Sequence, residues 1–247
     1  MKLDNRKRYL TVLDTETTGL NNIPALAFPL IYDIGWKLGD KLGNTIIDRE
    51  FIVQEIFYNP IMQNAFYGSK VEIYKERIFK ADILVKPFKE IIALLVHDIS
   101  LVKHNTLMAY NLNFDLRAIR STMVFLKMWD KENKDIKKFF PETLEYQDIW
   151  GLAVETLLMK KWDFLDFVTE HNQFTENGNP KTSAEVVYRY LTNNPDYIED
   201  HTALSDVQIE YEIAIKSLAT KKQFTKGILV NPWQKISKLY KELQGAI

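Results

Sequence analysis

The stretch Tyr9-Leu10-Thr11-Val12-Leu13-Asp14-Thr15-Glu16-Thr17-Thr18-Gly19-Leu20 places two carboxylates at the end of an apolar run. The run predicts a β-strand, in which successive side chains point to opposite faces. Asp14 and Glu16 are two residues apart, so we expect their side chains to lie next to each other. Neighbouring carboxylates raise each other's pKa, and a divalent cation removes that conflict, Mg²⁺ or Mn²⁺ being best suited to oxygen ligands. The alternative is a strand that simply ends in a polar turn.

Composition excludes several classes of site. The chain has 247 residues, enough for one large α/β domain or two small ones. It contains no cysteine, which excludes disulfides, thiolate metal sites and cysteine nucleophiles, and its four histidines are too dispersed to predict a multi-histidine zinc site. The first eight residues lack the apolar stretch of a signal peptide, and no segment approaches the ~20 apolar residues that span a bilayer. We therefore expect a soluble, cytoplasmic protein with no membrane contact.

Charge is segregated along the chain, although the formal net charge is only −1. Residues 1–8 carry four basic groups and one acidic group, and residues 216–247 carry seven lysines and one acidic group. The middle of the chain is therefore acidic. An acidic centre fits a carboxylate metal site, and basic ends fit contact with a polyanion. Solvated termini are the alternative.

The order of the predicted elements indicates an α/β fold with a mixed five-stranded sheet flanked by helices. Strands are expected within residues 9–20 and at 30–38, 44–53, 106–110 and 145–147. Helices are expected at 87–99, 113–129, 148–158, 183–191 and 202–219, with Asp148 as the cap of the third. Residues 54–86 predict two short helices interrupted by Gly68-Ser69, and residues 169–182 predict a surface loop.

The end of the chain predicts one more helix. Asn231-Pro232-Trp233 is a cap followed by a proline suited to the first helical turn. The following apolar residues share one helical face, which comprises Trp233, Ile236, Leu239, Tyr240 and Leu243. We expect this helix to dock on its own domain. The alternative is a helix that binds a partner or nucleic acid.

Three further residues provide acidic or basic groups that this architecture can bring together. Asp115 falls in the first turn of a predicted helix, where the helix dipole favours a carboxylate. His201 and Asp206 are five residues apart, and on one continuous helix their side chains would point ~140° apart. We therefore place Asp206 on the helix and His201 on the loop before it. The alternatives are a surface acid that supports a helix start and a surface histidine.

These residues form a pattern of Asp-x-Glu, Asp and His-x₄-Asp that resembles the DEDDh branch of the DnaQ-like 3′–5′ exonuclease superfamily. Residues 12–20 resemble the first motif, residues 109–115 the second, with Tyr110 where many members have histidine, and residues 201–206 the third. The resemblance covers roughly residues 8–220, except that residues 54–86 have no counterpart in it. It implies an RNase H-like exonuclease domain at 1–220, followed by a basic C-terminal tail with an amphipathic helix at 221–247.

The resemblance also implies roles for individual residues. It implies two Mg²⁺ or Mn²⁺ ions, held by Asp14, Glu16, Asp115 and Asp206, that clamp the attacking and leaving oxygens of a phosphodiester. His201 would be the general base, a task suited to a side chain with a pKa of ~6.5. The terminal-nucleotide pocket would be shaped by a further set of residues, which comprises Thr15, Gly19, Leu20, Phe66 and Tyr67. For the two aromatic residues of that set, packing under a loop is the alternative to base stacking.

The expected function is metal-dependent hydrolysis from single-stranded 3′ ends of DNA, with release of nucleoside monophosphates, in proofreading or repair. One alternative is an exoribonuclease that trims RNA, which a pocket for the 2′-hydroxyl would distinguish. Another is a non-catalytic polymerase accessory on the same fold. Single-stranded 3′ ends are the expected partner, together with a polymerase or another replication or repair protein.

Overall fold

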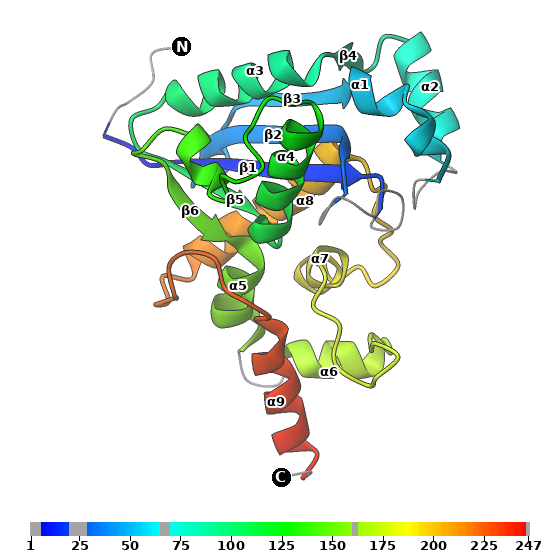
Figure 1. Ribbon diagram of the computed structural model, residues 1–247. Coiled ribbons are helices and arrows are strands. Elements are labelled where there is room, and N and C mark those ends of the chain that lie inside the picture. Colours follow the sequence, from blue (N-terminus) through cyan, green and yellow to red (C-terminus); the bar gives the residue numbers. More distant parts are fainter. Residues whose placement is uncertain (1–5, 20–28, 65–69, 160–162, 246–247) are drawn as a thin grey trace.

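The computed structural model describes residues 6–19, 29–64, 70–159 and 163–245. Its centre is a six-stranded mixed sheet in the order β4-β3-β2-β1-β5-β6 (Figure 1). β2 runs antiparallel to β1 and β3, and the remaining neighbouring pairs are parallel. The strands are β1 (Tyr9–Thr17), β2 (Ile31–Asp40), β3 (Thr45–Val53), β4 (Leu84–Lys86), β5 (Asn105–Ala109) and β6 (Glu145–Asp148).

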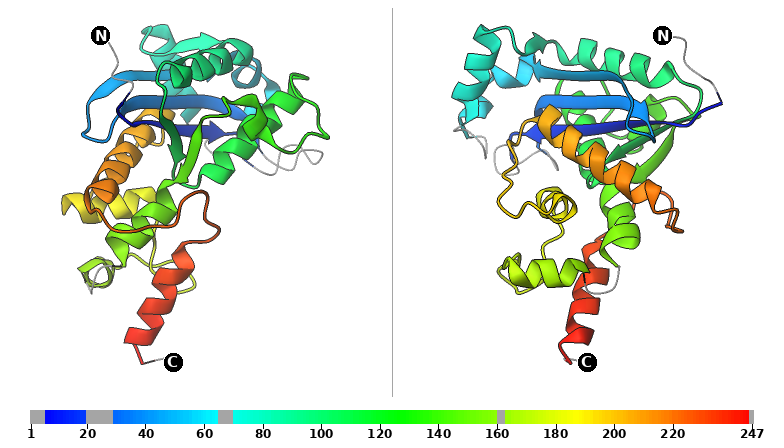
Figure 2. Two further views of the ribbon diagram at one scale, coloured as in Figure 1. Left: turned by 90° about the vertical axis from the view of Figure 1, so that its left-hand side faces the viewer. Right: turned by 180° about the vertical axis from the view of Figure 1, so that it is seen from behind.

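Helices cover both faces of this sheet, and further helices extend the molecule beyond it at one end. The described helices are α1 (Gln54–Phe57), α2 (Val71–Phe79), α3 (Phe88–Ser100), α4 (Leu112–Phe125), α5 (Ile149–Ala153), α6 (Asp163–Glu170), α7 (Ala184–Thr192), α8 (Ala203–Ala219) and α9 (Trp233–Leu243). α3 and α4 lie on one face, and α8 crosses the other (Figure 2, right). In the described residues no helix is long and apolar enough to cross a membrane.

The alternation of β1 separates the two larger hydrophobic cores of the described residues. Leu13 belongs to the core under α3 and α4, whereas Leu10 and Val12 belong to the core under α5, α7 and α8. Because side chains two residues apart share a face, Asp14 and Glu16 continue the row of Leu10 and Val12. The two carboxylates therefore stand on the face that α8 covers.

A glycine in β2 lets α8 approach the sheet closely. Gly35 pairs with Asp14 across the β1–β2 ladder. A Cβ atom at Gly35 would lie 2.8 Å from backbone atoms of Ala203 and Leu204, at the start of α8. A side chain there would push the helix away from the sheet. The glycine thus brings the first turn of α8 against the strand that carries the acidic pair.

The mixed α/β fold class is confirmed, but the predicted count of five strands is wrong. The additional strand, β4, has three residues, ends just before Pro87 and pairs only with β3 at the sheet edge. Three residues are too few to show a period of two. α6 also lies outside the predicted elements, although four of its eight side chains are buried. Its buried residues, Phe164, Leu165, Phe167 and Val168, have the spacing of one helical face, so the sequence did carry a signal for this helix.

The C-terminal segment packs against the β6 edge of the sheet. The Gly227 carbonyl accepts a hydrogen bond from the Asp148 N–H (3.1 Å), and the Gly227 N–H donates to Gln147 Oε1 (3.0 Å). α9 then extends away from the sheet, with Ile236 fully buried in the α8-side core (Figure 1). Lys235 Nζ lies 2.5 Å from Glu155 Oε1 beside it. The helix is therefore docked on its own chain.

Candidate active site

The acidic pair of β1 meets the N-terminal end of α8. One carboxylate oxygen from Glu16, one from Asp206 and one imidazole nitrogen of His201 all lie within 4.8 Å of one another. As expected, Asp206 is in the first turn of α8 and His201 is on the loop before the helix. Three of the predicted site residues, from segments about 190 positions apart in sequence, thus form one group.

The His201 side chain stands beside two carboxylates. Its Nδ1 atom lies 3.4 Å from Glu199 Oε2 and 4.0 Å from Asp206 Oδ2. The backbone of His201 has φ of 50°, in the left-handed region that residues with a Cβ atom rarely adopt. Burial lowers the pKa of this imidazole, and Lys70 lowers it further. Both effects favour the neutral form, which can accept a proton.

Asp115 joins the site from the other side of β1. It lies in the first turn of α4, and 2% of its surface is exposed. The Thr15 hydroxyl donates to Asp115 Oδ1 at 2.8 Å. Thr15, expected to shape a nucleotide pocket, thus bonds a carboxylate that is expected to bind metal. The contact fixes α4 against β1.

Asp148 is the predicted cap of α5, and it also supports α4. Its Oδ1 accepts from the Gly151 N–H (2.9 Å), and its Oδ2 accepts from the Leu112 N–H (3.1 Å). One carboxylate thus binds the N-terminal turns of two helices. Asn111, which precedes α4, has φ of 73°. This arrangement sets the direction in which α4 presents Asp115.

Crowding of carboxylates gives the site its electrostatic character. Burial, followed by the nearby Asp206 and Asp33 carboxylates, raises the pKa of Glu16 to about 8. Burial also raises the pKa of Asp115 to about 8 and that of Asp206 to about 7. The pKa of Asp14 is raised well above its usual value by burial and then by Glu210, Asp115, Asp206 and Glu16.

This donor set fits divalent cations of the hard class. These carboxylates raise one another's pKa when no cation lies between them. Once ionised, they concentrate negative charge at one place. Mg²⁺ and Mn²⁺ bind through such oxygens, and the buried positions limit competition from water. Asp14, Glu16, Asp115 and Asp206 are the residues that would hold them.

Sequence reasoning missed two further acidic residues. Glu210 is one helical turn beyond Asp206 and is 3% exposed. Its Oε2 atom accepts a hydrogen bond from the Tyr110 N–H at 3.0 Å. The spacing of four from Asp206 could have indicated that both side chains share a face of the helix. Glu199, beside His201, precedes the motif, and its pKa is raised to about 8 by burial and then by Asp206.

The remaining predicted substrate residues divide into two groups. Gly19 lies just beyond β1 with φ of 80°, a left-handed conformation that glycine adopts without strain. Leu20, Phe66 and Tyr67 lie outside the described residues. Their roles stay predictions.

A cavity of about 730 Å³ lies between the start of α4, the start of α7 and α9, and its lining includes none of the predicted site residues. Tyr110 and Asn111, which lead into α4, form one wall, and Trp233 of α9 lines it as well. The rings of Tyr110 and Trp150 stack with centroids 6.0 Å apart. The Tyr110 N–H, which donates to Glu210, is the link between this wall and the acidic group.

Comparison with known proteins identifies the fold. No protein-family model and no curated protein matches the chain. Solved structures do match. The nuclease domain of 3′hExo, described as a DEDDh family member bound to rAMP, is 11% identical with a TM-score of 0.58, and the match covers 91% of this chain and 100% of that chain.

Two further structures agree with this match. A 3′-exonuclease described as recognising the 3′ end of the histone mRNA stem-loop is 10% identical, with a TM-score of 0.55 over 89% of this chain and 85% of its own. E. coli ExoI, in a metal-free complex with single-stranded DNA, is 17% identical, with a TM-score of 0.52 over 88% of this chain and 40% of its own. The fold of this chain is therefore the RNase H-like nuclease fold of the DEDDh-family 3′-exonucleases.

Proposed function

We propose that the protein is a divalent-metal-dependent 3′–5′ exonuclease that removes nucleotides from single-stranded 3′ ends of DNA. The observation that carries the proposal is the group formed by Glu16, Asp206 and His201, with Asp14 and Asp115 beside it. Oxygen ligands and a neutral imidazole at one place are the parts needed for metal-assisted hydrolysis of a phosphodiester. The fold supports the same reading.

The reaction transfers a water oxygen to phosphorus and breaks the bond between phosphorus and the 3′ oxygen of the preceding nucleotide. The products are a nucleoside 5′-monophosphate and a strand that ends in a new 3′-hydroxyl. When bound, the cations neutralise the carboxylates and offset charge on the phosphate. His201 accepts the proton of the attacking water, and Glu199 lies close enough to orient the imidazole.

Other residues of the chain hold this arrangement in place. Thr15 and Asp148 fix Asp115 and the start of α4, as described above. Tyr110 and Trp150 offer half-buried rings in the cavity that Tyr110 links to Glu210, where stacking with a base would contribute ~1–3 kcal/mol. We propose that the nucleotides next to the scissile bond lie against this wall.

The choice between DNA and RNA is the second part of the proposal. The matched structures include one bound to rAMP and one bound to single-stranded DNA. We propose DNA as the substrate, with trimming of RNA as the competing function. A non-catalytic accessory role is disfavoured because all five residues of the motif are present.

The test is product analysis with purified protein. With Mg²⁺ or Mn²⁺, a single-stranded DNA oligonucleotide should yield nucleoside 5′-monophosphates, and a chelator should abolish the release. The same sequence as RNA should be degraded more slowly. Faster release from RNA would support the exoribonuclease, and binding of 3′ ends without release in either metal would support the accessory role.

A further inference from the structure

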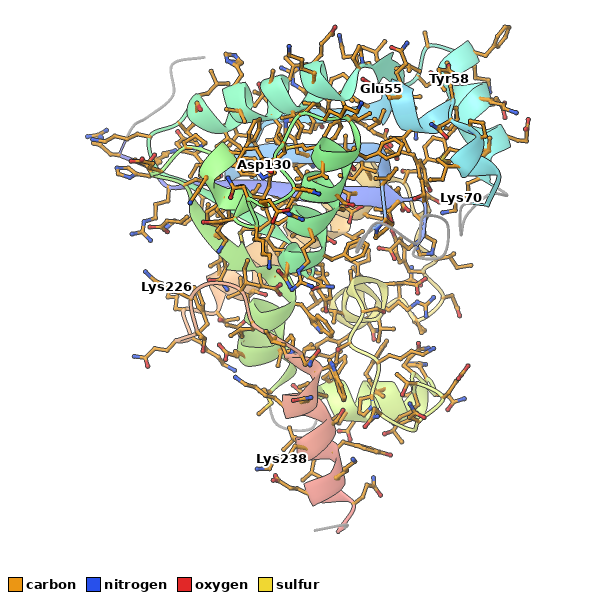
Figure 3. All side chains as sticks on the ribbon, in the orientation of Figure 1. Glu55, Tyr58, Lys70, Asp130, Lys226 and Lys238 are labelled. Carbon is orange, nitrogen blue, oxygen red and sulfur yellow. The ribbon has the colours of Figure 1, made fainter. Side chains whose placement is uncertain are left out.

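Helix α2 belongs to the part of the chain that the resemblance leaves unmatched, and one face of it contacts the active-site loop. Lys70, Tyr74 and Arg77 are spaced by four and three residues, so they share a face of the helix. Lys70 immediately precedes the helix, and Tyr74 is buried. Figure 3 shows Lys70 at the N-terminal end of α2, above the segment that leads to α8.

Lys70 binds the backbone of the loop that carries His201. Its Nζ atom donates to the carbonyl oxygen of Asp200 at 2.8 Å and to that of His201 at 2.9 Å. These two carbonyls flank the φ and ψ angles of His201. Because a left-handed residue with a Cβ atom persists only where its surroundings hold it, the ammonium group is placed to maintain this conformation.

A second anchor holds the chain on the other side of His201. Asp33 Oδ2 accepts a hydrogen bond from the Ala203 N–H at 3.0 Å, and the Tyr74 hydroxyl donates to the same oxygen at 2.7 Å. Residues 200–203 are thus held at one end by Lys70, which precedes α2, and at the other by Asp33, which Tyr74 of α2 orients. This restraint of residues 200–203 does not require any described side chain of α2 to bind a metal ion.

The helix itself is fixed to the sheet. Arg77 forms a two-pronged ion pair with Glu50 of β3, in which Nη1 lies 3.0 Å from Oε1. Such paired geometry restrains direction as well as distance. A displacement of α2 therefore requires either breaking this pair or moving β3.

We infer that α2 is the positioning element of the His201 loop, and that Lys70 is a positioning residue that holds the imidazole beside Glu16 and Asp206. It acts through the two backbone carbonyls and not on the substrate. The kinetic part of this inference rests on the proposed exonuclease function. The structural part does not.

The structural part is tested by hydrogen–deuterium exchange of residues 196–203, with Lys70→Met compared with the parent protein. Loss of the two hydrogen bonds should raise exchange in this segment while the core of the sheet stays protected. Lys75→Met, on the exposed side of the same helix, is the matched control and should leave exchange unchanged. Tyr74→Phe removes the hydroxyl that orients Asp33, the second anchor, without removing a charge, and should raise exchange at Ala203. Unchanged exchange in both Lys70→Met and Tyr74→Phe would overturn the inference.

The kinetic part is tested by introducing Lys70→Met into the parent protein and into the His201→Ala variant and comparing the loss of kcat in the two. Lys70→Met should lower kcat by about 10²-fold, because small displacements of a catalytic group have effects of this size, and should leave KM nearly unchanged. Lys70→Arg, which keeps the donors, should restore most of kcat. In the His201→Ala background, Lys70→Met should add little, because both changes remove the same function.

Two outcomes contradict the positioning role. An equal loss of kcat in both backgrounds, or a rise in KM with unchanged kcat, would show that Lys70 contacts the nucleic acid itself. If the parent protein releases no nucleotides, the proposed function fails, and the exchange experiment still decides whether α2 orders the loop.

Discussion

At the scale of single residues, the candidate site is defined by carboxylates that are buried close to one another. Asp14, Glu16, Asp115, Asp206 and Glu210 come from β1, α4 and α8. Each has its pKa raised, with burial as the main cause. A site of this kind costs folding free energy in the absence of cations, which is the pattern expected of a functional site and not of a stabilising one.

The first prediction concerns Asp14 and Asp206. Asp14→Ala and Asp206→Ala should each abolish nucleotide release, because each removes an oxygen ligand. Thermal unfolding in chelator should show a Tm equal to or higher than that of the parent, since repulsion is relieved. Asp166→Ala, an exposed acidic residue on α6, is the control for both measurements. A large loss of chelator-state stability in both variants would show that these residues are structural.

The second prediction concerns His201. His201→Ala should lower kcat by ~10²–10⁴-fold, the range for loss of a positioned proton acceptor. Affinity for Mn²⁺ should change little if the imidazole is the base and not a ligand. Titration calorimetry with Mn²⁺ measures that affinity directly. Should the variant lose Mn²⁺ binding and retain kcat at saturating Mn²⁺, the imidazole is a ligand and another group is the base.

Sequence reasoning found the site residues that obey local rules and missed those that depend on tertiary contacts. Asp14 and Glu16 follow from strand alternation, and the separation of His201 from Asp206 follows from helix geometry. Glu210 was within reach, since it shares a helical face with Asp206. Lys70 was not, because its partners are 130 and 131 positions away in the chain and are backbone atoms.

At the scale of elements too, the sequence predicted what local residue spacing determines and missed what it does not. Long helices with a clear apolar period, such as α3 and α8, were predicted within a few residues of their observed ends. β4 was missed because three residues carry no period. The helix predicted through Leu158 is capped by Asp148 as expected, but its last turn, Val154–Leu158, is π-helical. A one-residue bulge of this kind leaves no mark on hydrophobic spacing.

The third prediction concerns α9. Ile236 is fully buried against the core that α8 shares, so Ile236→Ala should lower the free energy of unfolding by about 2–5 kcal/mol. Urea unfolding should show a lower midpoint with an unchanged slope. Lys238→Ala, on the exposed side of the helix, should stay within about 0.5 kcal/mol of the parent. No loss of stability in Ile236→Ala would mean that α9 is free in solution and available to a partner.

At the scale of the whole molecule, the architecture places the acidic site where β1, α4 and the start of α8 meet. The described part of the chain begins beside the sheet and ends in α9, which extends away from it (Figure 1). The lysines of the C-terminal segment, such as Lys226 and Lys238, lie on the α5–α9 side of the molecule (Figure 3). A basic surface there would favour approach of a nucleic-acid strand over long range.

The fourth prediction is a pH dependence of stability in chelator. The folded protein holds protons on Glu16 and Asp115 up to a pKa of about 8, whereas the unfolded chain releases them near pH 4 to 5. Between these values the folded state binds more protons than the unfolded state, so stability falls as pH rises. Tm in chelator should therefore be lower at pH 8.5 than at pH 6.

Addition of Mn²⁺ should reduce this slope, because the cation replaces the protons as the partner of the carboxylates. Asp206→Ala should show a shallower slope in chelator than the parent. A Tm that rises between pH 6 and pH 8.5 in chelator would mean that the carboxylates are compensated by other groups.

The most direct test of the central claim is the course of degradation of one single strand that is labelled at its 5′ end. The account predicts a ladder that shortens one nucleotide at a time from the 3′ end in Mn²⁺, and no cleavage of the same strand closed into a circle. Asp14→Ala should leave the linear strand intact, and Asp166→Ala should degrade it as the parent does. Immediate release of the labelled terminal nucleotide, or cleavage of the circle at a comparable rate, would contradict the assignment as a 3′–5′ exonuclease.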